Sequence, residues 1–177
     1  TLHGIGRVGI QPGDSVVILG VGPIGTLFAL LARLCGAGCI VVSEPAAGRR
    51  EYIAGLGVDA AVDPTTRDLR DVVRSMTPRG ADVVVDAVGA LFADAMKVAR
   101  RGAKILLFGV NSRAQTTFRQ FDITDNEFDV LGSYIFDNTL FPRALKVLES
   151  GTLPLENLIT HRLPLAQIHD GIHLLRQ

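Results

Sequence analysis

The stretch Gly20-Val21-Gly22-Pro23-Ile24-Gly25 decides the fold that we expect of this 177-residue chain. It follows the apolar run 15–19 and opens the apolar run 26–32, so a buried strand would lead through a glycine-rich turn into a buried helix. Glycines at these three positions allow a tight turn, a close approach of the backbone to phosphate, and close packing of helix on strand. Pro23 suits the first helical turn, where its missing N–H costs nothing. The pattern predicts a loop that binds the pyrophosphate of a dinucleotide at a helix N-terminus, whereas no Lys-Ser/Thr follows as in a phosphoryl-transfer loop.

Apolar runs and helical stretches alternate on both sides of this loop, which is typical of a parallel sheet built from right-handed crossovers. The expected strands are Ser15–Leu19, Cys39–Ser43, Ala60–Val62, Asp82–Asp86, Lys104–Phe108 and Asp129–Ser133. The expected helices are Pro23–Leu34, Arg49–Leu56, Leu69–Met76, Phe92–Val98 and, near the end, about Leu140–Ser150 and Leu165–Leu175. Six strands predict an α/β Rossmann fold, with a doubly wound parallel sheet and helices on both faces.

Two segments interrupt this alternation. The polar connection Asn111–Glu127 is long for a loop in a compact domain, which indicates either a functional flap or a surface that contacts another domain or subunit. The extended segment Leu158–Pro164 would need a sheet edge that the six strands need not supply. We therefore expect a dinucleotide-binding domain over residues 1–150 and a tail over residues 151–177.

Composition excludes several classes of function. Acidic and basic residues number eighteen each, so no overall field would attract nucleic acid or an anionic membrane. The chain carries no apolar run of membrane-spanning length and does not begin like a signal peptide. We expect a cytoplasmic protein with a small-molecule partner, no nucleic acid and no membrane.

Glu44 stands at the end of the second expected strand, where a carboxylate can accept hydrogen bonds from an adenosine ribose and would repel a 2′-phosphate. This favours NAD over NADP. Arg49 and Arg50 follow in the same turn and weaken the argument, because an arginine there can accommodate a 2′-phosphate or simply lie on the helix surface.

Small residues end two further strands, at 86–89 and 108–110, and would let the backbone approach a flat ring. Gly89 and Gly109 would equally well do no more than end their strands.

The remaining residues of chemical interest have simpler interpretations. Cys35 and Cys39 lie at the end of an apolar helix and the start of a buried strand, where free cysteines act as small hydrophobes. His169 and His173 are four residues apart on one helix, yet no recognisable motif supplies an acidic third metal ligand beside them. We interpret the aspartates 63, 82 and 86 as turn or strand-end residues, and no hydrolase, zinc-protease or kinase motif occurs in the sequence.

With these residues in place, the chain resembles the medium-chain dehydrogenase/reductase family, and within it the zinc-dependent alcohol and polyol dehydrogenases. The resemblance covers the run 9–16 leading into the glycine loop, Ser43-Glu44-Pro45 with the two arginines, and the segment 56–59. It also covers the segment 158–165, by which chains of that family return to a catalytic domain. Phe108-Gly109-Val110 and Gly132-Ser133-Tyr134 are most similar to the sorbitol, arabinitol and butanediol dehydrogenase branch.

The resemblance implies roles for particular residues. Glu44 would hold the adenosine ribose and Arg49 would lie by the adenine, while Val88, Val110 and Phe136 would border the nicotinamide. The pyrophosphate would lie against five loop residues: Gly20, Gly22, Pro23, Ile24 and Gly25. Some sorbitol dehydrogenases carry Arg-Tyr where this chain has Ile135-Phe136, which puts sorbitol itself in doubt.

The resemblance also implies a reaction, in which an alcohol or polyol is oxidised by NAD with the help of zinc. The family's zinc ligands lie upstream of a position equivalent to Thr1, so we expect zinc only in an N-terminal domain that is absent here. We expect the chain alone to bind coenzyme without activity, and to form a homo-oligomer, a dimer in the family's manner, through the edge strand Asp129–Ser133. Two alternatives remain, a zinc-free NADPH-dependent quinone or enoyl reductase and a non-enzymatic module binding a nucleotide or S-adenosylmethionine.

Overall fold

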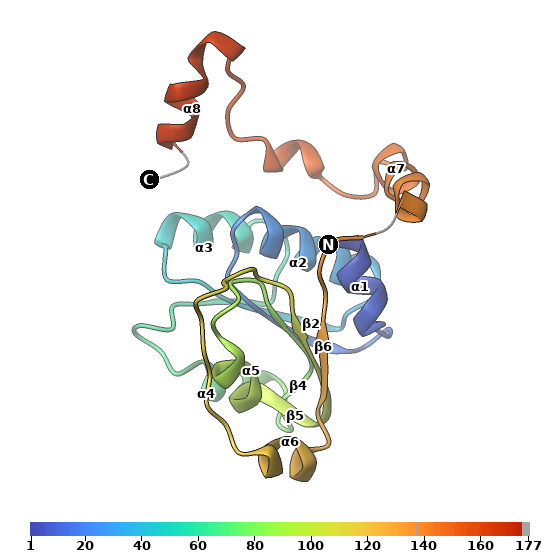
Figure 1. Cartoon of the computed structure of the whole chain (residues 1–177), viewed down its shortest axis with the longest axis vertical. Coiled ribbons are helices and arrows are strands. Elements are labelled where there is room, and N and C mark those ends of the chain that lie inside the picture. The colour runs from blue at the N-terminus through green and yellow to red at the C-terminus, as the bar shows by residue number, and fades with distance from the viewer. Residues whose placement is uncertain (137, 175–177) are drawn as a thin grey trace.

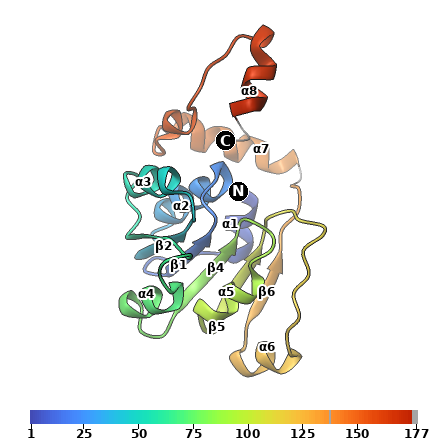
Figure 2. The same cartoon turned by 90° about the vertical axis from the view of Figure 1, so that its left-hand side faces the viewer.

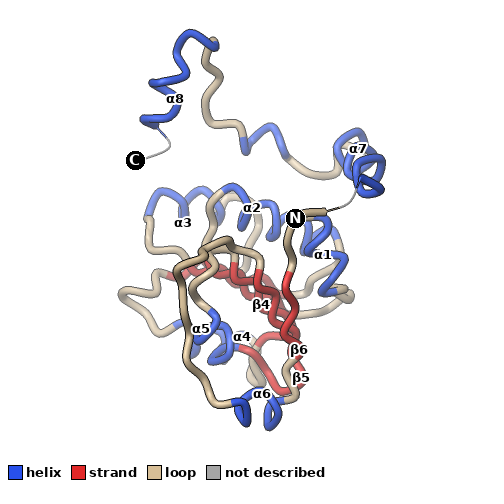
Figure 3. The backbone as a smooth tube through the Cα atoms, viewed as in Figure 1, coloured by secondary structure: helices blue, strands red, loops and turns tan. Residues whose placement is uncertain are grey.

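A six-stranded parallel sheet forms the centre of the protein, whose computed structural model describes residues 1–136 and 138–174 (Figure 3). The sheet order is β3-β2-β1-β4-β5-β6, and all five neighbouring pairs are parallel. The strands are β1 (Ser15–Leu19), β2 (Cys39–Ser43), β3 (Ala60–Val62), β4 (Ala81–Asp86), β5 (Ala99–Leu107) and β6 (Asp129–Gly132). The order reverses between β1 and β4, so the predicted doubly wound Rossmann fold is confirmed.

Helices cover both faces of the sheet (Figure 2). On one face lie α1 (Leu2–Val8), α2 (Pro23–Leu34) and α3 (Ala47–Ala54); on the other lie α4 (Leu69–Met76) and α5 (Phe92–Val98). The short helix α6 (Gln120–Asn126) precedes β6. The later segments α7 (Phe141–Glu149) and α8 (Ile168–Leu174), with 3-10 turns at Asn138–Leu140, Leu155–Leu158 and Leu165–Gln167, extend away from the sheet (Figure 1). No helix in the described residues is long and apolar enough to cross a membrane.

The strand residues alternate between two apolar cores, one on each face of the sheet. In β1, Val16 and Ile18 pack with the residues of α1 and α2, whereas Val17 and Leu19 pack with those of α4 and α5. All five residues of β1 are buried, as expected of a central parallel strand covered on both sides. The continuous apolar runs of the sequence are therefore explained by burial on both faces.

The structure corrects several predicted element boundaries. Helix α3 begins and ends two residues earlier than predicted. Strand β5 begins at Ala99 rather than Lys104, and its pairing with β4 shifts register between Ala81 and Val83. The connection Asn111–Glu127 is not entirely a loop, because α6 occupies 120–126. This helix has no buried residue, so its polar sequence carries no apolar pattern that would have predicted it.

The tail departs from its prediction as well. Leu158 ends a 3-10 turn, and residues 159–164 join no strand among the described residues, so the expected sheet pairing is not found there. The predicted helix 165–175 is a 3-10 turn followed by α8, and Leu175 lies outside the described residues. Residues 151–174 include no buried side chain among those described, and the domain division at residue 150 stays a prediction.

Asp82 ties the amino ends of β1 and β4 together and supports a prediction on pH dependence. Its Oδ2 accepts hydrogen bonds from the backbone N–H of Ser15 at 2.8 Å and from the Ser15 hydroxyl, while Oδ1 accepts one from Arg100 Nε. Burial alone would raise the pKa of Asp82, but these hydrogen bonds and the Arg100 charge lower it below its ordinary value. The resulting stabilisation is complete above the unfolded-state pKa of about 4 and is lost as pH falls through the lower folded-state pKa.

We expect Asp82→Asn to lower the free energy of unfolding by about 1–3 kcal/mol at pH 7 and by less at pH 3, because the amide nitrogen cannot accept a hydrogen bond and the charge that pairs with Arg100 is lost. Urea denaturation at the two pH values measures this. Asp94→Asn, which removes an exposed ion pair with Lys97 on α5, is the control and should change stability by less than about 0.5 kcal/mol. An equal loss of unfolding free energy in the two variants would contradict the stabilising role of Asp82.

Candidate functional site

The loop Gly20–Gly25 joins β1 to α2 at the carboxyl edge of the sheet, beside the point where the strand order reverses. Gly20 has φ 86°, and its N–H donates to the carbonyl of Ser43 at 2.8 Å, which ties the loop to β2. Gly25 lies so close to the start of the loop that a Cβ on Gly25 would be 1.9 Å from the carbonyl oxygen of Gly20. A Cβ on Gly22 would meet no heavy atom within 4 Å, so this face of the loop is open.

Helix α2 begins directly from this loop, with Gly22 at the N-cap and Pro23 in the first turn. The N–H groups of a first helical turn have no acceptor within the helix, and the helix dipole adds positive potential there. Ile24 is partly exposed at the same end. The five predicted loop residues thus lie together in a cradle with the shape and polarity to accept an anionic group.

Glu44 is buried at the end of β2 and binds the loop directly. Its Oε2 accepts a hydrogen bond from the N–H of Val21 at 3.0 Å, and its Oε1 accepts one from the N–H of Ala46 at 3.0 Å. Only 4% of the residue is exposed. A carboxylate offers about four acceptor positions, so Glu44 can hold the loop in place and still accept hydrogen bonds from a ligand.

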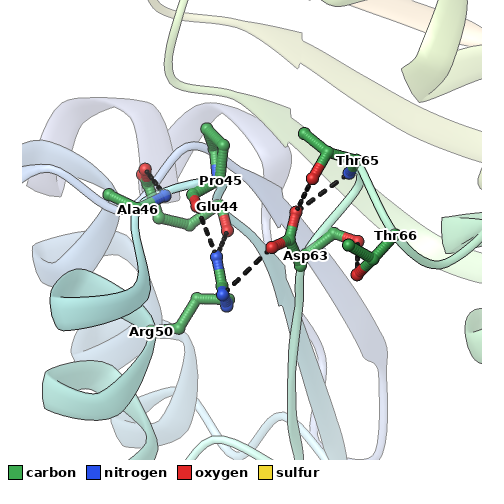
Figure 4. Close-up of polar contacts among 7 residues, drawn as sticks. All are labelled: Glu44, Pro45, Ala46, Arg50, Asp63, Thr65 and Thr66. Carbon is green, nitrogen blue, oxygen red and sulfur yellow. Dashed lines mark hydrogen bonds and ion pairs between the residues drawn. The ribbon is translucent and has the colours of Figure 1, made fainter.

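The two arginines of the β2–α3 turn have different surroundings (Figure 4). Arg50 Nη1 donates to the carbonyls of Glu44 and Pro45 at 2.8 and 2.6 Å, and its Nη2 lies 3.0 Å from Asp63 Oδ2. Arg49 is more than half exposed, with Nη1 3.9 Å from Glu44 Oε2. Arg50 therefore stabilises the turn that presents Glu44, and Arg49 is the arginine with freedom to contact a ligand.

Asp86 organises the loop that follows β4, a role that its sequence context does not show. Its Oδ1 accepts hydrogen bonds from the N–H groups of Val88 and Gly89, and its Oδ2 accepts one from Leu91, at 2.7–2.9 Å. This holds Val88 against the glycine loop, since a Cβ on Gly20 would lie 2.5 Å from Val88 Cγ2. The interpretation of Asp86 as a strand-end residue is confirmed, and so are those of Asp63 and Asp82, which accept hydrogen bonds from Thr65 and Ser15.

The ends of β4 and β5 meet closely. A Cβ on Gly109 would lie 2.1 Å from the backbone nitrogen of Gly89, so glycine is required for this contact. Val88 and Val110 remain exposed beside it, at 44% and 75%. Phe136 contacts α7: its ring is 5.5 Å from that of Phe141, and both line a cavity of about 180 Å³ with Thr1, Leu2, His3, Leu140 and Ala144.

A cavity of about 300 Å³ opens at the carboxyl ends of β1 and β2, on the face that α4 and α5 cover. Ser43, Pro64 and Leu91 line it, together with several charged side chains: Arg67, Asp68, Arg70, Asp94 and Lys97. The cavity thus opens at the carboxyl end of β2, the strand that Glu44 directly follows.

Metal ligands do not gather in the part of the chain that the structure describes: no group of three or more His, Cys, Asp or Glu side chains there could hold a metal ion. Burial raises the pKa of the Cys35 and Cys39 thiols, which keeps them neutral at pH 7. The described residues therefore do not fit a zinc site.

Comparison with known proteins gives consistent matches. The profile of the zinc-binding dehydrogenase family matches residues 23–150. The chain is 29% identical to the sorbitol dehydrogenase of Bacillus subtilis over 97% of its length, and 35% identical to the 2-dehydro-3-deoxy-L-galactonate 5-dehydrogenase of Pseudoalteromonas atlantica over 94%. It covers 49% of each of these proteins, so the chain spans about half the length of the curated relatives it matches.

Several solved structures have the same fold over most or nearly all of this chain. Alcohol dehydrogenase TADH from Thermus sp. ATN1 superposes with a TM-score of 0.93 at 26% identity, over 99% of this chain and 51% of that one. A protein of Sinorhizobium meliloti assigned as a zinc-binding dehydrogenase is bound to NADP. It is 32% identical to this chain and superposes with a TM-score of 0.78, over 88% of this chain and 47% of its own. An alcohol dehydrogenase of E. coli CFT073 with the same fold is complexed with NADH. It is 24% identical to this chain and superposes with a TM-score of 0.90, over 99% of this chain and 52% of its own.

Proposed function

Because the chain belongs to the zinc-binding dehydrogenase family, as its coenzyme-binding domain, we propose that it binds NAD(H) for the oxidation of a secondary alcohol or polyol to a ketone. The observation that carries this proposal is the open cradle at Gly22, where α2 begins, held in place by the hydrogen bond from Val21 to Glu44. The nicotinamide, when bound, accepts the hydride from the alcohol carbon. Residues of this chain bind the coenzyme and orient it.

We propose that the dinucleotide crosses the carboxyl edge of the sheet, with its pyrophosphate at the first turn of α2. Glu44 would accept hydrogen bonds from the adenosine ribose, and the cavity at Ser43, Pro64 and Leu91 would lie next to the adenine. Val88 and Val110, with their exposed apolar side chains, would cover one side of the nicotinamide. Phe136 would border it from the side of α7.

NAD is the coenzyme that we propose, because the buried carboxylate of Glu44 would lie at the ribose position and would repel a 2′-phosphate. The alternative, a zinc-free NADPH-dependent quinone or enoyl reductase of the same superfamily, draws support from two observations. Arg49 is exposed within 3.9 Å of Glu44, and the S. meliloti relative is bound to NADP. A guanidinium at that distance could pair with a 2′-phosphate.

The proposed substrate class follows from the relatives, whose names specify sorbitol and a deoxy-galactonate. Both are polyhydroxylated, so we propose a secondary hydroxyl of a polyol or sugar acid as the group that is oxidised. Assistance by zinc would require ligands from elsewhere in the whole protein, since the residues described here do not fit a zinc site.

We also propose that two copies associate through β6, in which Asp129 and Val130 are exposed at the sheet edge next to β5. Size-exclusion chromatography with light scattering should give twice the chain mass of 18.9 kDa. A Val130→Lys variant should shift the mass towards the monomer, and a monomeric wild-type chain would contradict the proposal.

The coenzyme proposal is tested by titrating the chain with NADH and with NADPH and following nicotinamide fluorescence. We expect NADH to bind more tightly, by about tenfold or more, which corresponds to at least about 1.4 kcal/mol. Tighter binding of NADPH would support the reductase alternative instead. No binding of either coenzyme would refute the proposed function.

A further inference from the structure

Ser133 contains a buried hydroxyl that the described residues leave without a hydrogen-bond partner. The residue is 8% exposed, and among the side chains that the structure describes its Oγ is the buried polar atom for which no partner is found. Buried polar groups in native proteins are nearly always paired, since an unpaired one costs free energy. The hydroxyl of Ser133 therefore requires an explanation.

The position of Ser133 points to a ligand. It directly follows β6, and its N–H donates to the carbonyl of Leu107 at 3.0 Å, which continues the pairing of β6 with β5 by one residue. By the same register Ser133 lies beside Phe108, on the face of the sheet that α1 and α2 cover. The hydroxyl thus lies at the carboxyl edge, where ligands of doubly wound sheets bind.

The sheet order assigns this end of the edge to one half of a dinucleotide. Glu44, at the end of β2, lies on one side of the reversal between β1 and β4, while Ser133, at the end of β6, lies on the other. A dinucleotide whose pyrophosphate occupies the central loop places its two nucleosides on opposite sides of it. With the adenosine at Glu44, the nicotinamide would lie over the ends of β4, β5 and β6, beside Val88 and Val110.

We propose that the Ser133 hydroxyl forms a hydrogen bond with the carboxamide of the nicotinamide and so positions the ring. This inference rests on the proposed function. The carboxamide offers both a carbonyl acceptor and an NH₂ donor, and a serine hydroxyl complements either one. Rotation about χ1 of Ser133 moves Oγ between three staggered positions, and the proposal requires one of them to face the ligand.

The test compares NADH with ADP-ribose, which has the adenosine and both phosphates but lacks the nicotinamide. For Ser133→Ala we expect the Kd for NADH to rise about threefold to tenfold, and the Kd for ADP-ribose to stay within about twofold of wild type. Calorimetric titration measures both ligands in the same way. A defect in packing alone would weaken both ligands equally.

Stability supplies a second readout. Removing an unpaired buried hydroxyl should leave the Tm of the ligand-free chain unchanged or raise it, while the rise in Tm that saturating NADH produces should be smaller than in wild type. Ser75→Ala, which removes a hydroxyl that is already paired with Val72 on α4, is the matched control and should leave the ratio of the two Kd values unchanged.

Equal loss of NADH and ADP-ribose affinity in Ser133→Ala, or no loss of NADH affinity, would overturn the assignment of Ser133. These results are distinct from failure of the proposed function, in which the wild-type chain itself would not bind NADH.

Discussion

Gly25→Ala is expected to abolish NADH binding and to lower the free energy of unfolding by about 3 kcal/mol, at the upper end for overpacking substitutions. A Cβ at this position would lie 1.9 Å from the carbonyl oxygen of Gly20 and 2.9 Å from its carbonyl carbon. Both atoms are backbone, so either the loop or the start of α2 must move. Either movement displaces the first-turn N–H groups from the pyrophosphate position.

Thermal unfolding and NADH fluorescence titration measure the two effects of Gly25→Ala. The Tm should fall by about 6–12 °C, and binding should be lost even at temperatures where circular dichroism shows the chain to be folded.

The matched control is Gly6→Ala, also a glycine within a helix, because a Cβ on Gly6 would meet no heavy atom within 4 Å. It should keep wild-type binding and gain about 0.5–1 kcal/mol from helix propensity. A Gly25→Ala chain that binds NADH as wild type does would show that the close approach of α2 to the loop is not needed.

Glu44→Gln is expected to raise the Kd for NADH by about tenfold or more and to reduce the preference for NADH over NADPH. The amide has nearly the shape of the carboxylate but lacks its charge, and its nitrogen cannot accept a hydrogen bond. The N–H of either Val21 or Ala46 then loses its acceptor, which loosens the loop, while the repulsion of a 2′-phosphate disappears.

Fluorescence titration of Glu44→Gln with both coenzymes gives the two Kd values, with Glu51→Gln as the control. Glu51 is exposed on α3, so its replacement should leave both values within about twofold. If Glu44→Gln discriminates between NADH and NADPH as strongly as wild type does, Glu44 does not select the coenzyme.

The sequence predicts the sheet and its central helices well because each has a strong local pattern. The bounds of β1 and α2 agree with their predictions to the residue, since a buried apolar run, a glycine turn and Pro23 mark them unambiguously.

Helix α1 was not predicted, because Gly4 and Gly6 lower its helix propensity. Packing explains it: Ile5 and Val8 are buried, and Gly4 lies so close to Phe28 that a Cβ there would be 2.8 Å from the ring. Helix formation here depends on tertiary contacts that the local sequence does not encode.

The candidate site was predicted in part. The glycine loop and Glu44 come together as expected, because both lie at carboxyl ends of adjacent strands. The contacts that hold them could not be predicted. Arg50 looks like Arg49 in the sequence, and only the fold brings Asp63 to one of them; the unpaired hydroxyl of Ser133 likewise emerges only once its neighbours are known.

We propose the open cradle between β1 and α2 as a nicotinamide dinucleotide site, and calorimetric titration of the chain with NADH and with S-adenosylmethionine tests this most directly. We predict saturable binding of one NADH per chain and no heat of binding from S-adenosylmethionine. Binding of S-adenosylmethionine without binding of NADH would contradict the account.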